Sequence, residues 1–425
     1  MFGRALLRFA LTLPACALAL AGCGGGGASQ PDPRLHSTQL TIYSSSPQRG
    51  PLRAVAADVV DAEQLALAEQ GGRVGRYRVR LLALDASTPG AGRSDPAQIS
   101  QNARRAAKDP RTVAYLGELA TGSSAISIPL LNEAGILQVS PLDTAMSLTT
   151  TSLAVAGSPE RLYPKLRDVG RTFARVVPSD RSQVDALLAD MRQNDVRRLA
   201  ILTDEDPSGR ALATNLRAKA HAAGIVVVAR EEIDEHAPRH DDAIVRIGEA
   251  QPDALLDATG ARPGAARLWR ELHAAEPRLQ LFAPANLADP SFVAGLGSAA
   301  AVAHVTRPVL AEGDDTPASW RFSRVFARRY GHAPAPEARY GYEAMRSVVD
   351  AIRRAERRTS DGLITRAAVV RAYFATAPRD GVLGRYAIDA AGDTSLRDWA
   401  AYRVADGHLG FSGTLSGGRA GSGER

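Results

Sequence analysis

The stretch that decides the fold is VAYLGELATGSSAISIPLLNEAGILQVSPLDTAMSLT, residues 113–149. Its first residues, 113–116, are apolar and predict a short buried strand, and residues 136–140 predict a second strand of the same kind. The helix between them is expected to end at Gly135. This strand-helix-strand order predicts two parallel neighbours in one sheet.

Each of these strands is followed by a polar turn. The first is Thr121-Gly122-Ser123-Ser124, and the second covers residues 140–144. Parallel strands present their carboxyl ends at the same edge of a sheet, where open α/β sheets bind ligands. The first turn also begins the helix, whose unpaired N–H groups favour an anion such as a carboxylate. The sequence therefore predicts a binding site at this edge, without a catalytic group.

Strands and helices alternate on both sides of this stretch. Residues 39–43 and 77–84 predict two strands before it, each followed by an amphipathic helix. After an aperiodic excursion over residues 150–172, a second alternating set begins. Together the two sets predict an α/β protein with two doubly wound parallel sheets. The second set comprises helices over 183–193, 209–223, 242–249 and 264–274, and strands over 199–203, 225–228, 254–257 and 279–283.

The first 23 residues, MFGRALLRFALTLPACALALAGC, have the layout of a secretory signal. A positive start is followed by a short apolar stretch and then by small residues before Cys23. The apolar run is too short for a comfortable membrane span. Leu20-Ala21-Gly22-Cys23 resembles a bacterial lipobox, which implies removal of residues 1–22 and lipidation of Cys23. We expect residues 23–38 to form a flexible tether and residues 412–425 a disordered tail, since both are rich in glycine and serine.

The composition excludes several classes of site. The chain has 425 residues, of which 45% are hydrophobic and 23% charged, enough for two globular domains. Of its two cysteines, Cys16 would leave with the leader and Cys23 would carry lipid, so no thiol remains for a disulfide, a zinc site or a nucleophile. The formal net charge is +6, but no basic stripe interleaved with aromatic residues indicates nucleic-acid binding. We expect a monomer without a cofactor, a metal or a nucleic-acid partner.

Six segments spread over residues 39–411 resemble the substrate-binding proteins of branched-chain amino-acid ABC transporters, in their lipoprotein form. The family has the type I periplasmic-binding-protein fold, which implies two doubly wound parallel-sheet lobes joined by three hinge crossovers, with the ligand held between the lobes. The segments are DAEQLAL (61–67), YLGELATGSSA (115–125), NEAGILQVSP (132–141), FARVVPSD (173–180), YGYEAM (340–345) and VLGRYAIDAAGD (382–393).

The resemblance also implies where the chain passes between the lobes. We expect crossings near residues 173–177, 282–285 and 388–396. The first lobe would then contain residues 39–174 and 284–390, and the second lobe residues 175–283 and 391–411.

In the amino-acid binders of this family, the two polar turns of the first lobe hold the carboxylate of the ligand. Thr121 and Thr144 offer hydroxyl donors, and the backbone N–H groups around Gly122 and Ser123 would point at the same spot. The alternative is that these residues only cap a helix and form a turn. The resemblance assigns ligand binding in this lobe to Thr121, Gly122, Ser123, Ser140, Leu142, Asp143 and Thr144.

The second lobe departs from the family pattern at two positions. Ser208 stands where the amino-acid binders commonly have an aromatic residue. In the loop that contains Gly260, Arg262 or Pro263 stands where they have an acidic residue that receives the ammonium of the ligand. A buried ammonium without a counter-charge is costly, so a small carboxylate or amide fits about as well as an α-amino acid. Ser208 and Gly260 remain expected ligand contacts, and the acids that could compensate are Asp143, Asp204, Glu205 and Asp257.

Signatures of an enzyme or a metal site are weak. The segment TGSSA (121–125) is not the GxSxG nucleophile elbow. His236 and His240 lie in the acidic segment EEIDEHAPRHDD (231–242), but Pro238 between them disfavours a shared helical face. We interpret this segment as a solvated loop that enters a helix.

The sequence as a whole predicts an extracytoplasmic solute-binding lipoprotein, anchored to the cell membrane through Cys23 on its periplasmic or outer-surface side. It would capture a small polar metabolite, an amino acid or a related carboxylate or amide, and deliver it to the permease of an ABC importer. The alternative is a ligand-sensing lipoprotein that acts on a membrane signalling partner without transport. Both would use solvated lobe surfaces for docking, so the sequence leaves both open.

Overall fold

The computed structural model describes Leu35 and residues 37–88, 94–234, 236–237, 239–260, 262, 264–308, 316–375 and 377–416. All of these belong to one compact unit, Arg34–Arg425. The leader, Cys23, most of the expected tether and residues 417–425 of the expected tail lie outside the described residues.

Six strands form the first sheet in the order β2-β3-β1-β4-β5-β6. All neighbouring pairs are parallel except β2 with β3. Every residue of β4 and β5 is buried, which is typical of central strands covered on both faces. The strands are β1 (Gln39–Ser46), β2 (Arg73–Val74), β3 (Tyr77–Asp85), β4 (Thr112–Leu116), β5 (Leu137–Ser140) and β6 (Phe173–Arg175).

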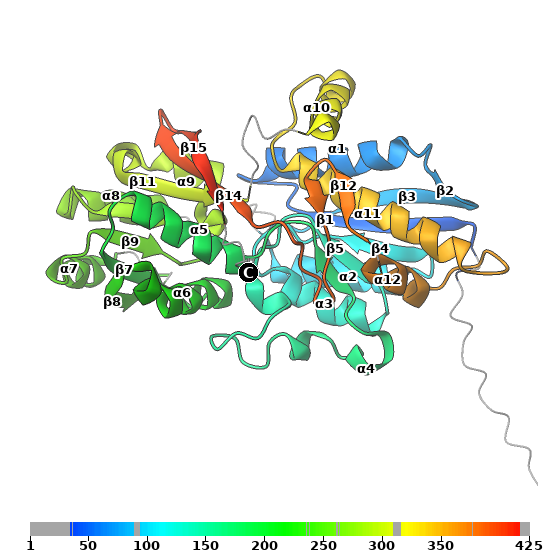
Figure 1. The fold of residues 1–425 in the computed structure, drawn as a ribbon, viewed down its shortest axis with the longest axis horizontal. Coiled ribbons are helices and arrows are strands. Elements are labelled where there is room, and N and C mark those ends of the chain that lie inside the picture. Colours follow the sequence, from blue (N-terminus) through cyan, green and yellow to red (C-terminus); the bar gives the residue numbers. More distant parts are fainter. Residues whose placement is uncertain are drawn as a thin grey trace, which may run out of the picture. The chain divides into compact units, whose positions relative to one another are not determined.

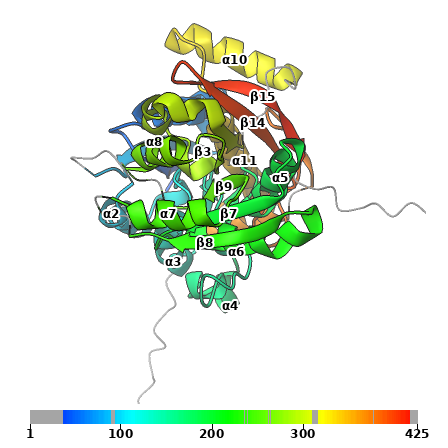
Figure 2. The same cartoon turned by 90° about the vertical axis from the view of Figure 1, so that its left-hand side faces the viewer.

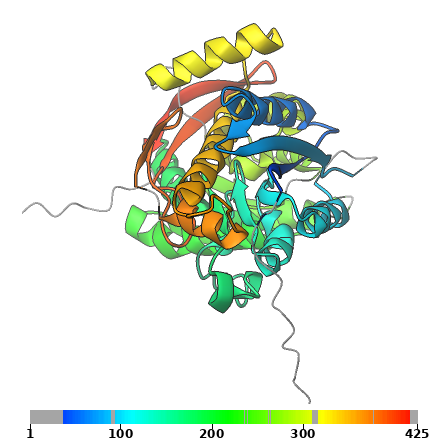
Figure 3. The ribbon, with the colours of Figure 1, turned by 90° about the vertical axis from the view of Figure 1, so that its right-hand side faces the viewer.

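Helices cover both faces of this sheet. One face packs against α1 (Arg53–Ala68), α11 (Ala338–Arg357) and α12 (Arg366–Phe374) in the largest hydrophobic core of the described residues. Figures 1 and 3 show α1 and α11 side by side over it. The other face packs against α2 (Pro96–Lys108) and α3 (Ser124–Glu133) around Tyr43, Tyr115 and Leu131. We call this sheet and these helices the first lobe.

The contact between α1 and α11 depends on a glycine. A β-carbon on Gly341 of α11 would lie 2.5 Å from the backbone oxygen of Val59 in α1 and 2.8 Å from its Cγ1 atom. We expect Gly341→Ala to lower the free energy of unfolding by about 1–3 kcal/mol, because the two helices would have to separate. Chemical denaturation measures this loss. The matched control is Gly413→Ala in β15 (His408–Ser416), where nothing lies within 4 Å of the added carbon, so its denaturation midpoint should stay unchanged.

Seven strands form the second sheet in the order β15-β14-β11-β10-β9-β7-β8, with β7 to β11 parallel and the two C-terminal strands antiparallel. Trp269 and Phe292 centre the core on one face, and Val184 and Leu216 belong to the core on the other. We call this sheet and its helices, which Figure 2 shows around β7 to β9, the second lobe. Its elements are α5 (Asp180–Gln193), β7 (Arg198–Thr203), α6 (Pro207–Ala220), β8 (Val226–Glu232), α7 (Asp241–Glu249), β9 (Ala254–Asp257), α8 (Ala265–Ala275), β10 (Gln280–Ala283), α9 (Pro290–Gly295), β11 (Ala303–Arg307), β14 (Asp398–Ala405) and β15.

The chain passes between the sheets at three places. The first passage follows β6, and the last lies between β13 (Gly384–Tyr386), which pairs with β12 (Arg379–Gly381), and β14. The expected passage near residues 282–285 is wrong, because β11 continues the second sheet beside β10. The chain returns only after Arg307, before α10 (Pro317–Tyr330), whose Phe322 and Phe326 lie in the first lobe's core. The strand was missed because AHVTR is short and carries a histidine and an arginine.

Part of each expected flexible end is folded. Leu35, placed in the tether, is buried in the first lobe's core, and its N–H donates to the carbonyl oxygen of Ile364 at 2.8 Å. Residues 412–416, placed in the disordered tail, belong to β15, which pairs with β14 along its length. Glycine and serine predict disorder only where no neighbouring strand offers hydrogen bonds, and β14 offers them here.

Candidate functional site

The two predicted polar turns of the first lobe do meet. Thr121 follows β4 and Thr144 follows β5, and their hydroxyl oxygens lie 3.0 Å apart. Because β4 and β5 are parallel neighbours, their carboxyl ends share one edge of the sheet. Two threonine hydroxyls at this edge can donate to, or accept from, a polar group of a ligand.

A carboxylate of the chain itself, that of Asp143, binds the N-terminus of α3. The carboxylate of Asp143 accepts hydrogen bonds from the N–H groups of Gly122 at 2.7 Å and Ser124 at 2.8 Å. The N–H group of Ser123 donates to Ala120 O at 3.1 Å. The expectation that the backbone N–H groups of Gly122 and Ser123 would hold a ligand's carboxylate is therefore wrong in this structure, because Asp143 and Ala120 use both donors. Burial raises the pKa of Asp143, although Arg175 and the N–H groups of Gly122 and Ser124 favour the ionised form.

Ser140 organises the second turn. Its hydroxyl donates to the carbonyl oxygen of Glu118 at 2.7 Å and accepts from the N–H group of Asp143 at 2.8 Å. Ser140 is fully buried, so its hydroxyl supports the turn. Leu142, the next predicted contact, packs partly buried against the first lobe's core.

Thr121 faces the second lobe across a small cavity of about 10 Å³, room for a single water molecule. Ser208 and Gly209, at the start of α6, form part of the opposite wall. A β-carbon on Gly122 would collide with the Ser208 hydroxyl, so the two walls touch at this point. The cavity is lined by Thr121, Asp180, Gln183, Ser208, Gly209, Leu212, Pro284 and Asn286.

Asp180 lines the cavity but is not among the predicted ligand contacts. It begins α5 directly after the first passage between the sheets, and its N–H donates to Thr144 O at 2.8 Å. The side-chain amide of Gln183 is oriented so that its nitrogen donates to Asp180 Oδ1 at 3.0 Å and its oxygen accepts from the Thr306 hydroxyl at 2.8 Å. Burial raises the pKa of Asp180 to about 7, while the Thr144 hydroxyl and Arg175 favour its ionised form. The site therefore contains a carboxyl group that can change its charge near neutral pH.

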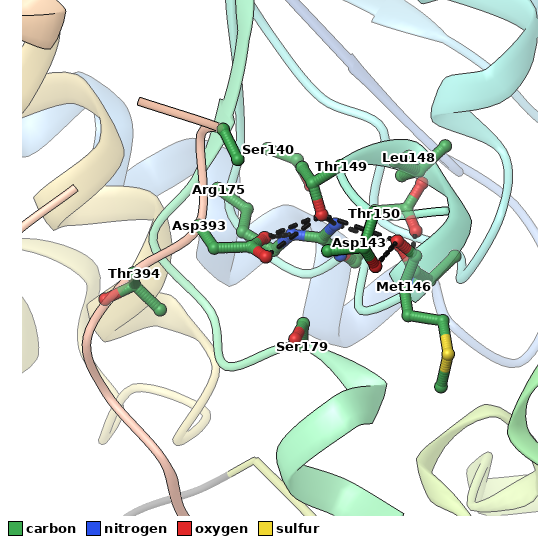
Figure 4. A network of polar contacts seen from close by, with 12 residues as sticks. Ser140, Asp143, Met146, Leu148, Thr149, Thr150, Arg175, Ser179, Asp393 and Thr394 are labelled. Carbon is green, nitrogen blue, oxygen red and sulfur yellow. Dashed lines mark hydrogen bonds and ion pairs between the residues drawn. The ribbon is translucent and has the colours of Figure 1, made fainter. Parts of the chain in front are cut away.

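Arg175 fixes the position of the second turn, as Figure 4 shows. Its guanidinium is fully buried and donates to Asp143 O at 2.8 Å and to Ala145 O at 2.9 Å, on either side of Thr144. Its Nε atom pairs with the Asp393 carboxylate at 2.9 Å, and Thr149 bridges the two side chains. Arg175 thus ties the first passage, the second polar turn and the last passage together.

Of the nine predicted ligand contacts, Thr121 and Ser208 line the cavity. Thr144 does not line it but is hydrogen-bonded to two lining residues, Thr121 and Asp180. Gly260 donates its N–H to Asp204 Oδ2 at 2.9 Å and is not among the lining residues. The signal for Asp180 was its place at the end of FARVVPSD, next to a crossing. Among the described residues no group of His, Cys, Asp and Glu gathers as a metal site.

A model of the periplasmic binding protein family matches residues 40–408 of this chain. The Leu/Ile/Val-binding protein BraC3 of Rhizobium johnstonii is 28% identical over 246 residues, which are 56% of this chain and 59% of that protein. The chain thus matches less than two thirds of the length of this relative.

Two solved structures are similar in fold. The leucine-binding protein LivK of Thermotoga maritima gives a TM-score of 0.72 at 23% identity, over 89% of this chain and 99% of that one. A solute-binding protein of an ABC transporter from Rhodopseudomonas palustris, crystallised with p-hydroxybenzoic acid, gives 0.70 at 16% identity, over 89% and 97%. The predicted α/β fold with two doubly wound, mainly parallel sheets is confirmed.

Proposed function

Because this chain belongs to the periplasmic binding protein family, we propose that it is a solute-binding lipoprotein that captures a small polar metabolite between its lobes and delivers it to an ABC importer. The observation that carries this proposal is the meeting of Thr121 and Thr144 of the first lobe with Asp180, Ser208 and Asn286 of the second lobe. Polar groups from both lobes that converge on one cavity can bind a solute only when the lobes are together.

Capture requires the walls to separate first. A cavity that holds one water molecule cannot contain an amino acid, and ligand pockets usually measure about 300–1,000 Å³. The two walls meet where Gly122 touches Ser208, so we propose that the lobes part there by bending at the three passages between the sheets. A solute that contacts both walls would then favour closure around itself.

Asp180 is our candidate for the group that receives a positive charge on the solute. It lies in the cavity wall beside Thr144, and an ammonium group there would favour its ionised form. Asp180, next to the first passage between the sheets, would thus take the place of the acid that is missing at residues 262–263. The named relatives, which include a Leu/Ile/Val-binding protein and a protein crystallised with an aromatic carboxylate, suggest the solutes to try first.

The test is thermal unfolding of the chain from Gly24 onward, which retains the compact unit Arg34–Arg425. The panel contains branched-chain and polar amino acids, aromatic and aliphatic carboxylates, and their amides. A solute at a hundred times its dissociation constant adds about 2.7 kcal/mol to the free energy of unfolding and raises the melting temperature measurably. If no member of the panel raises it, the proposal of a small polar solute is wrong.

Replacing both Thr121 and Thr144 by valine should abolish binding of the solute found in that panel. Valine keeps the shape of threonine but removes both hydroxyls, so the polar group of the solute would be buried without its partners. We expect affinity to fall by a factor of about a hundred or more, as titration calorimetry can measure. The control is the double serine variant, which keeps both hydroxyls and should bind within a few-fold of the unmodified chain. If the valine variant binds the solute as tightly as the unmodified chain, the solute binds elsewhere.

Membership of the family implies an extracytoplasmic location. No helix within the described residues combines the length and the apolar character that a membrane span requires. We propose that a lipid on Cys23 provides the attachment to the membrane, because the residues before it resemble a lipobox.

A further inference from the structure

Arg262 is a buried cation with an unused hydrogen-bonding edge. Its exposed fraction is 6%, and neither Nε nor Nη2 has a hydrogen-bond partner among the described residues. These two nitrogens form the side of a guanidinium that holds a carboxylate through two parallel hydrogen bonds. A buried charge without a partner is unfavourable, so a partner from outside the chain would stabilise it.

The guanidinium of Arg262 lies over the start of α8. Its Nη1 atom is 3.8 Å from the position of a β-carbon on Gly264, the residue that caps this helix. Gly264 has no side chain to accept from the N–H groups of the first turn, and that turn contains no acidic residue. Arg262 Nη1 therefore lies close to the positive end of an eleven-residue helix, and the guanidinium and the helix end both attract an anion.

Charges of both signs act on His240, and that of Arg262 is one of them. Burial lowers the pKa of His240, and the charges of Arg262 and Arg267 lower it further. Glu271 and Asp234 act on His240 in the opposite sense, but Glu271 already lies 3.7 Å from Arg267 Nε. Neither acid satisfies the free edge of Arg262.

The loop that carries Arg262 begins at Ala258 and Thr259, which contact residues of the cavity wall between the lobes. The side chain of Asn286, which lines the cavity, donates to Thr259 O at 2.9 Å. Gly209, another lining residue, packs so closely on Ala258 that an added β-carbon would collide with its carbonyl oxygen. Arg262 follows three residues after Thr259, at the carboxyl edge of β9, where α/β sheets bind ligands.

We propose that Arg262 binds a carboxylate of the captured solute through its Nε and Nη2 edge. The inference rests on the proposed function and narrows it, since the solute must then carry a carboxylate that reaches the second lobe. The amino-acid binders of the family hold the ligand's carboxylate at the first lobe and its ammonium at the second, and here the second lobe would hold a carboxylate. Asp143 already occupies the helix end of the first lobe. Asp180, which contacts Thr144 of that lobe, would receive the positive group, and Arg262 would receive the negative one.

The test compares solutes that differ only in a carboxylate and an amide, such as glutamate with glutamine and succinate with succinamate. Titration calorimetry of the chain from Gly24 onward should show the carboxylate member binding at least tenfold more tightly. In Arg262→Gln this preference should fall below about twofold, and Arg262→Lys should keep part of it, since lysine has the charge without the paired donors. The matched control is Arg217→Gln, an exposed arginine on α6, which should keep the full preference.

A second readout does not need the solute. Since the guanidinium of Arg262 has an unsatisfied edge, Arg262→Met should raise the melting temperature of the ligand-free chain by at least about 1 °C. A fall of several degrees would show that the arginine stabilises the fold and would overturn the inference. So would an unchanged preference for carboxylates in Arg262→Gln. If the unmodified chain binds no panel member, both the proposed function and this inference fail, whereas binding without a carboxylate preference overturns the inference alone.

Discussion

Replacing Arg175 by methionine should lower the free energy of unfolding by about 3–5 kcal/mol. The substitution removes one partner of a buried ion pair and leaves the Asp393 carboxylate, only 13% exposed, without its counter-charge. It also leaves the carbonyl oxygens of Asp143 and Ala145 without this donor and removes one donor to the Thr149 hydroxyl. Urea denaturation followed by circular dichroism measures the loss.

The same variant should bind the solute more weakly even where it is folded. The two carbonyl groups held by Arg175 flank Thr144, so their release lets the Thr144 hydroxyl, a proposed ligand contact, move. The matched control is Arg239→Met, which breaks the exposed pair of Arg239 with Asp241 and should leave both the denaturation midpoint and the affinity unchanged. A loss of less than about 1 kcal/mol in Arg175→Met would mean that the network adapts to the missing arginine.

The first lobe could be predicted well from the sequence because its strands are apolar and its turns carry glycine and hydroxyl residues. The hydrophobic runs of β4 and β5 and the glycine after α3 gave the order of the central elements. The contact of Thr121 with Thr144 followed from the parallel pairing alone. The role of Asp143 did not, because sequence spacing does not tell whether an acid in a turn faces a ligand or the neighbouring helix end.

The second lobe was harder because its edge depends on pairing between distant segments. The hairpin of β14 and β15 had a local signal, since Asp406 and Gly407 form its turn with φ values of 52° and 72°. β11 had none, and its place beside β10 is decided by tertiary packing. The end of FARVVPSD placed Asp180 next to a crossing, but the packing of α5 beside α6 and Asn286, which brings it to the cavity, is not encoded locally.

The stability of this protein should decrease as the pH rises from 5 to 8. Glu63 and Glu118 are buried, and burial raises the pKa of each from 4.5 to about 8. In the folded chain they keep their protons over a range in which the unfolded chain has lost them. Since the folded state then binds more protons, each such carboxyl lowers the free energy of unfolding by about 1.4 kcal/mol per pH unit between these pKa values.

Glu118 is the better position for testing this slope, because its partners are known. Its carboxyl group accepts from Ser45 Oγ and from Tyr115 Oη, each at 2.8 Å, beside the first turn of the candidate site. Glu118→Gln keeps the shape and removes the titrating proton, so its melting temperature should fall less between pH 5 and pH 8 than that of the unmodified chain. Glu249→Gln, at an exposed position on α7, should leave the pH dependence as it is. A melting temperature that rises over this range in the unmodified chain would mean that both buried carboxyls are ionised in the folded state, with a compensating charge near each.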